Sequence, residues 1–125
     1  MGRILALDYG HVRIGLALSD EDQKFAFEHE IWKRPDFFER LPELIKEKDI
    51  AKIILGYPLN MASEPTAKTA EVLRFKKELE EKAKLPVELV DERLSSKMAA
   101  KLAGTDKNID ALAAQILLEN YLAKK

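Results

Sequence analysis

The sequence predicts an α/β fold: a five-stranded mixed sheet with helices on both faces. Two observations carry this prediction. Three short apolar segments separated by turn residues come first, which is typical of strands paired as hairpins. Apolar segments then alternate with stretches in which apolar residues recur every three or four positions, the pattern of strands alternating with helices. The order is β-β-β-α-β-α-β-α-α, so the sheet should be antiparallel in its first half and parallel in its second.

The first half of the chain supplies three strands and one helix. The strands are expected at residues 3–8, 12–19 and 25–32. Tyr9, Gly10 and His11 separate the first two strands and favour a hairpin turn. A helix ending near residue 48 is indicated by Pro35, which suits a first helical turn, and by the apolar spacing that follows it. Its apolar residues are Phe37, Phe38, Leu41, Leu44 and Ile45.

The second half alternates strands with helices. Strands are predicted at residues 50–56 and 86–90, and helices from Ser63 to about residue 84, at 95–103 and at 109–123. The long helix has an apolar inner face formed by Val72, Phe75, Leu79 and Ala83. Its charged residues are expected to form a solvated outer face.

Length and composition limit the possible functions. A chain of 125 residues predicts one domain over residues 1–125, and no leader pattern or long apolar run is present, so we expect a cytoplasmic protein with no membrane contact. Without cysteine, and with only two isolated histidines, disulfides, thiolate sites and His-rich zinc sites are excluded. The net charge of −1 means that any contact with a polyanion must be local.

Asp8 is the most informative residue, because it ends an apolar strand on the same face as Ile4 and Ala6. A buried carboxylate is costly unless it is hydrogen-bonded or neutralised by a cation. One interpretation is a turn in which Asp8 accepts hydrogen bonds from the amides around Gly10. The other is a metal site.

Acids at two further positions favour the metal site. Asp91 and Glu92 end the last predicted strand, and Asp110 lies in the first turn of the last helix. Each has a structural explanation, since the strand-end acids could pair with Arg93 and the helix dipole favours Asp110. However, the carboxyl ends of neighbouring parallel strands meet at one edge, where such sheets bind ligands. Carboxylates gathered there would select Mg²⁺ or Mn²⁺, and two such ions catalyse in-line phosphoryl displacement.

Four segments carry a family resemblance across nearly the whole chain. They are LALDYGHVRIGLA at 5–17, IILGYPLNM at 53–61, DERLSS at 91–96 and IDALAAQILLENYL at 109–122. In this order and spacing they resemble the YqgF family, the RuvX-type Holliday junction resolvases of the ribonuclease H-like superfamily. The resemblance implies a ribonuclease H-like fold and metal-dependent phosphodiester hydrolysis. It also implies that the metal-binding acids are Asp8, Asp110 and either Asp91 or Glu92.

Residues near these acids are candidates for nucleic-acid binding: Arg13, Asn60, Arg93, Lys97 and Lys107. The forked donors of the arginines suit phosphate, although salt bridges to the neighbouring acids would use the same geometry. Asn60 could instead stabilise a turn. Tyr9 could stack on an exposed base or pack in the core.

The resemblance implies one of two substrates, and we expect processing of the 5′ end of the small-subunit ribosomal RNA precursor. One alternative is resolution of branched DNA, which would require a two-fold dimer, and the sequence leaves the oligomeric state open. A second alternative is a non-catalytic module that binds ribosome precursors. The LDYG segment also resembles the phosphate loop of actin-like kinases, but 125 residues supply one of the two domains that those enzymes need.

Overall fold

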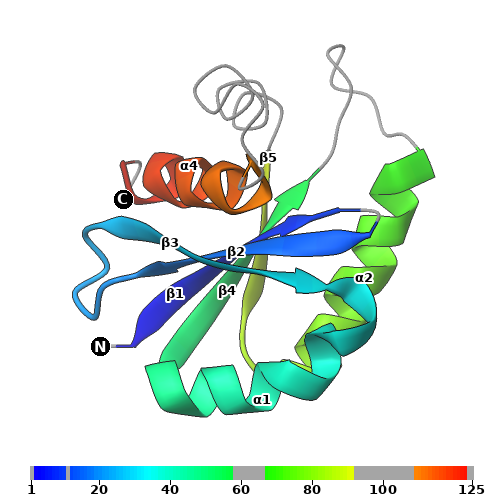
Figure 1. Cartoon of the computed structure of the whole chain (residues 1–125), viewed down its shortest axis with the longest axis horizontal. Coiled ribbons are helices and arrows are strands. Elements are labelled where there is room, and N and C mark those ends of the chain that lie inside the picture. The colour runs from blue at the N-terminus through cyan, green and yellow to red at the C-terminus, as the bar shows by residue number, and fades with distance from the viewer. Residues whose placement is uncertain (1, 11, 58–66, 92–108, 124–125) are drawn as a thin grey trace.

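The computed structural model describes residues 2–10, 12–57, 67–91 and 109–123, and its elements follow the predicted order (Figure 1). The strands are β1 Arg3–Tyr9, β2 Arg13–Ser19, β3 Ala26–Lys33, β4 Ile50–Tyr57 and β5 Val87–Asp91. The helices are the 3₁₀ helix η1 Arg34–Asp36 and the α-helices α1 Phe37–Lys48, α2 Ala67–Ala83 and α4 Ile109–Ala123. Every predicted strand boundary agrees within one residue. The predicted helix at 95–103 lies outside the described residues.

Within the described residues the strands form one mixed sheet in the order β3-β2-β1-β4-β5. The pairs β1–β2 and β2–β3 are antiparallel, as hairpins require. The pairs β1–β4 and β4–β5 are parallel, because a helix separates the two strands of the second pair and returns the chain to the same end of the sheet. The predicted division into an antiparallel and a parallel half is therefore confirmed.

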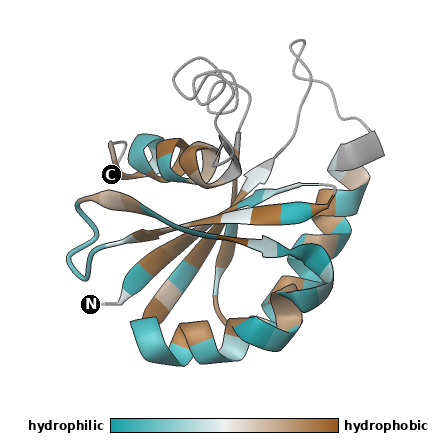
Figure 2. Cartoon of the chain, in the orientation of Figure 1, coloured by the Kyte–Doolittle hydropathy of each residue, from teal (hydrophilic) through white to brown (hydrophobic). Residues whose placement is uncertain are grey.

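Helices cover both faces of the sheet (Figure 1). On one face, α1 and α2 pack on Leu5, Leu7 and the residues level with them in neighbouring strands. On the other face, α4 packs on Ile4 and Ala6. Figure 2 shows β1 and β4 as mainly apolar, as expected for strands that are covered on both sides.

The helices bury the residues that their periodicity predicts. In α2, Val72, Phe75 and Leu79 are buried against the sheet. In α4, Ala114 and Leu117 are buried, and so is Leu118. None of the described helices is both long and apolar enough to cross a lipid bilayer.

Polar contacts attach the carboxyl-terminal part of α4 to the parallel strands. Lys52 of β4 donates hydrogen bonds to Glu88 of β5, at 2.7 Å, and to the hydroxyl of Tyr121 in α4. The Tyr121 hydroxyl also donates to Glu88 at 3.2 Å. These bonds raise the pKa of Lys52 and lower the pKa of Glu88, so both groups stay charged near neutral pH.

Candidate functional site

Asp8 is partly buried on the α4 face, one residue before the end of β1. Leu7 is level with Leu55 in β4, so Asp8 is level with the next residue of β4, Gly56. Gly56 in turn pairs with Val90 of β5. Asp8 is therefore a carboxylate at the edge where the carboxyl ends of three parallel strands meet.

The hairpin after Asp8 requires glycine at position 10. The Gly10 amide donates a hydrogen bond to the carbonyl oxygen of Arg13 at 3.0 Å. A Cβ atom at Gly10 would lie 2.4 Å from that same oxygen, closer than van der Waals contact allows. The Gly10 amide is therefore used in closing the hairpin. This tight closure places Arg13, which is exposed, at the start of β2 beside the edge.

The backbone of Asp91 lies at the same edge. Asp91 is the last residue of β5 and pairs with Tyr57, the last residue of β4. This pair lies one step beyond the level of Asp8. Adjacent residues of a strand face opposite sides of a sheet, so at most one of Asp91 and Glu92 is expected to share the face of Asp8.

The first turn of α4 also comes to this edge. Tyr121, near the end of α4, contacts Lys52 near the start of β4, and α4 runs roughly against the direction of β4 (Figure 1). The backbone of Asp110 is eleven residues before Tyr121, or about 16 Å along a helix. Gly56 is four residues after Lys52, or about 13 Å along a strand. The two lengths bring Asp110 close to the level of Asp8.

Several predicted site residues lie outside the described residues: Asn60, Glu92, Arg93, Lys97 and Lys107. For Asp91 and Asp110 the structure describes the backbone. Among the described side chains no group of three histidines or acids is close enough to hold a metal ion. The backbone of Asp91 lies one step beyond the level of Asp8 in the neighbouring strand, and a common metal site for Asp8, Asp91 and Asp110 stays a prediction.

The opposite face of the same edge carries charged residues, three of which lie on the long helix whose charged side is predicted to be solvated. A cleft of about 460 Å³ opens beside Tyr9, between the sheet and α2. Its charged lining residues are Arg34, Glu71, Arg74 and Glu78. The three from α2 are spaced by three and four residues, so they share one helix face with the buried Phe75. The spacing of three and four residues is the feature of the sequence that indicates a shared helix face. Tyr9 itself is 4% exposed and packs on Phe75, with ring centroids 4.6 Å apart.

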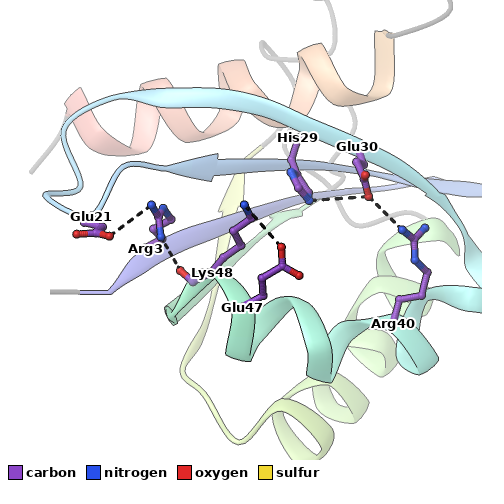
Figure 3. A network of polar contacts seen from close by, with 7 residues as sticks. All are labelled: Arg3, Glu21, His29, Glu30, Arg40, Glu47 and Lys48. Atoms are coloured by element: carbon purple, nitrogen blue, oxygen red, sulfur yellow. Dashed lines mark hydrogen bonds and ion pairs between the residues drawn. The ribbon is translucent and has the colours of Figure 1, made fainter.

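A second polar cluster is structural. Figure 3 shows contacts that link β3 to α1 and Arg3 to the end of α1. Glu30 accepts hydrogen bonds from the Trp32 indole at 2.6 Å and from Arg40 at 3.2 Å, and its carboxylate is 3.8 Å from His29. Burial lowers the pKa of His29, against the opposing effect of Glu30. This cluster lies on the α1 side of the sheet, away from the face of Asp8.

Comparisons with known proteins identify the family of this chain. The family model described as "RuvX: Holliday junction resolvase" matches residues 2–124. A protein of Maridesulfovibrio salexigens named "Putative pre-16S rRNA nuclease" is 41% identical over 133 residues, covering 98% of this chain and 98% of that protein. Proteins with the same name from Syntrophomonas wolfei and Bordetella pertussis are 40% and 35% identical, covering 96% and 95% of this chain and 93% and 92% of their own lengths.

Among solved structures, the chain resembles Thermus thermophilus RuvC in complex with a Holliday junction substrate. The TM-score is 0.61 at 13% sequence identity, covering 99% of this chain and 96% of that chain. At this identity the likeness concerns the fold, and it confirms the predicted ribonuclease H-like architecture.

Proposed function

Because this chain belongs to the RuvX family of Holliday junction resolvases, we propose that it is a cytoplasmic nuclease that hydrolyses phosphodiester bonds of the small-subunit ribosomal RNA precursor. The observation that carries the proposal is the position of Asp8. It is a partly buried carboxylate on the α4 face, at the edge where the parallel strands end. The choice of RNA follows the names of the most similar relatives described above.

The proposed metal ligands are Asp8, Asp110 and one of Asp91 and Glu92. Their donors are all carboxylate oxygens, which suit Mg²⁺ or Mn²⁺. The surroundings fit such a site, because Gly56 beside Asp8 has no side chain to fill the space at the edge. When bound, two divalent ions would stabilise the attacking and leaving oxygens of an in-line displacement.

The chain's own residues would bind and orient the substrate. Arg13 is three residues after Gly10 and is exposed, so its guanidinium can contact a phosphate of a strand bound at Asp8. Asn60, Arg93, Lys97 and Lys107 are proposed as further contacts to the strand. Each would supply a local positive charge or hydrogen-bonding group, although the net charge of the whole chain is −1.

The description of the family model favours a second candidate substrate, branched DNA. A resolvase must cut two strands symmetrically, so this activity would require a two-fold dimer. Cleavage of a four-way DNA junction and of precursor RNA by the same preparation, together with its oligomeric state, distinguishes the two substrates.

The test of the proposed site is Asp8→Asn, with Asp22→Asn in the exposed β2–β3 loop as the matched control. We expect Asp8→Asn to lower cleavage of precursor RNA in Mn²⁺ by about a hundredfold or more, since even outer-shell partners of metal ligands contribute 10- to 100-fold. The melting temperature should not fall, because the substitution removes a partly buried charge. Asp22→Asn should cleave like the wild type.

Three results would reject the proposal. They are cleavage by Asp8→Asn at the wild-type rate, wild-type cleavage that is unchanged by EDTA, and tight RNA binding without cleavage under any metal. The last would favour the non-catalytic module. Separate Asp91→Asn and Glu92→Gln variants identify the second ligand, and we expect a large loss in only one of them, since neighbouring strand residues face opposite sides.

A further inference from the structure

The cleft beside Tyr9 lies at the same end of the sheet as Asp8 but on the α1–α2 face. Tyr9 directly follows Asp8, and consecutive Cα atoms are about 3.8 Å apart. A strand that is held at Asp8 would reach the cleft by passing around the end of β1. With a volume of about 460 Å³ the cleft is large enough for one nucleotide.

Aromatic rings form the inner wall of the cleft. Phe75 of α2 packs on Tyr9 at 4.6 Å and on Phe38 of α1 at 5.4 Å between ring centroids. Tyr9 and Phe75 are almost fully buried, whereas Phe38 is only partly buried. The Phe38 ring is also contacted by Phe37, at 5.2 Å between centroids, and by the Lys82 ammonium, 4.4 Å from its centroid. The part of the ring that lines the cleft is the surface available to a ligand.

Charged groups of both signs form the rim. Arg34 is anchored through its amide, which donates to the carbonyl of Val12 at 3.1 Å, and its guanidinium lies 4.8 Å from the centre of the Tyr9 ring. Arg74 is exposed on α2, and Glu71, one turn earlier, is partly buried. The ion pairs of α2 within the described residues join Lys76 to Glu80 and Lys82 to Glu78, and neither involves Arg74 or Glu71.

Few ligands suit a cleft with an aromatic wall and charged groups of both signs on its rim. The Glu71 carboxylate on the lining would repel a simple polyanion, and two arginines would repel a metal ion. A nucleotide can contact the arginines, the aromatic wall and the carboxylate at once. Its phosphate accepts hydrogen bonds from arginine, its flat base stacks on an aromatic ring, and an N–H on the edge of the base donates to the carboxylate.

We propose that the cleft binds one unpaired nucleotide of the substrate strand, next to the nucleotides held at Asp8. The base lies against Phe38, the phosphate contacts Arg34 and Arg74, and Glu71 accepts a hydrogen bond from the base edge. The nucleotide must be unpaired, because stacking within a duplex hides the face of the base. This inference rests on the proposed nuclease function, and it specifies a single-stranded segment beside the cleaved bond.

Binding is tested without metal, in EDTA, by titrating AMP, CMP, ribose 5-phosphate and inorganic phosphate while recording amide NMR shifts. We expect both nucleotides to bind more tightly than ribose 5-phosphate, with shifts centred on η1, α1 and the first half of α2. Arg74→Gln should weaken nucleotide binding about threefold to tenfold, as for an exposed charged contact. Phe38→Leu should remove at least about fivefold of the preference for nucleotide over ribose 5-phosphate.

The controls are Lys77→Gln, which is exposed on α2 outside the cleft lining, and Phe27→Leu, which is exposed on β3. Both should bind AMP like the wild type. Equal binding of AMP and ribose 5-phosphate, or an Arg74→Gln affinity equal to that of Lys77→Gln, would overturn the inference even if the protein cleaves RNA. If the protein binds nucleotides at the cleft but cleaves no nucleic acid, the nucleotide site is supported and the proposed nuclease function is rejected.

Discussion

Single residues at the end of β1 determine the local geometry of the candidate site. Asp8 and Tyr9 are neighbours in sequence, yet their side chains lie on opposite faces of the sheet. Gly10 then closes the turn so tightly that its amide reaches the Arg13 carbonyl. The chain therefore reverses immediately after the acid, and the carboxylate and the aromatic cleft come to one edge.

Gly10→Ala tests whether this reversal matters for activity. The new Cβ would lie 2.4 Å from a backbone oxygen, so the hairpin must shift, at a cost of about 1 to 3 kcal/mol typical of overpacking. We expect a lower urea midpoint and a loss of cleavage per folded molecule.

Gly2→Ala is the matched control. Its Cβ would lie 2.5 Å from the Cβ of Ala51, at the opposite end of β1, so it should lower stability and leave cleavage per folded molecule unchanged. Equal loss of activity in both variants would contradict a local role for the Gly10 turn.

At the scale of elements, α1 is attached to the edge strand β3 through polar as well as apolar contacts (Figure 3). The side chain of His29 is 22% exposed beneath α1 and lies near Glu30, which Arg40 of α1 also contacts. Burial keeps the pKa of His29 below its ordinary value of 6.5, so the neutral imidazole is favoured in the fold. We therefore expect the attachment of α1 to be sensitive to pH.

We expect stability to fall as the pH drops below about 6.5. In that range the unfolded chain binds a proton at His29 more readily than the folded chain does, so protonation favours unfolding until the pH reaches the folded pKa. The pKa of Glu30 is lowered from 4.5, so this carboxylate titrates below the window.

Urea midpoints at pH 7.5 and pH 5.5 measure the effect. His29→Gln should reduce the difference between the two midpoints, and an unchanged difference would show that other groups cause it. Comparing the variant with the wild type separates His29 from His11, the other histidine of the chain.

At the scale of the whole molecule, charge limits how tightly nucleic acid is held. The chain has 21 basic and 22 acidic residues, so no general positive field attracts a polyanion. Binding must come from a few contacts near the edge of Asp8. Of the proposed contacts at that edge, Arg13 is described by the structure.

Salt dependence measures the number of these contacts. Each phosphate neutralised on a single strand contributes about 0.7 to the slope of log affinity against log salt, so three or four contacts predict a slope of about −2 to −3. Arg13→Gln should reduce that slope by about 0.7. Arg40→Gln, on α1 beside Glu30, should leave it unchanged. A wild-type slope near zero on both RNA and DNA would remove nucleic acid from the ligands of this protein.

Local sequence patterns predict every element that the structure describes, and their order. Strand boundaries agree within one residue and the last helix spans the predicted residues, because alternation and helical spacing are local properties that each segment carries independently. The same local pattern identified Asp8 as an acid at the end of a core strand. The binding roles predicted for Asp91, Glu92 and Asp110 rest on the sequence, and the structure adds the backbone positions of Asp91 and Asp110 alone.

Which segments lie side by side depends on the tertiary structure. The order β3-β2-β1-β4-β5 places β1 between an antiparallel and a parallel neighbour, and α4 runs back so that its first turn approaches the level of Asp8. The cleft could not be predicted, because Tyr9, Arg34 and Arg74 come from separate segments. Sequence periodicity indicates which side of an element is buried, but the partner it is buried against depends on how distant elements pack, and that packing placed two arginines of this chain beside a shared aromatic wall.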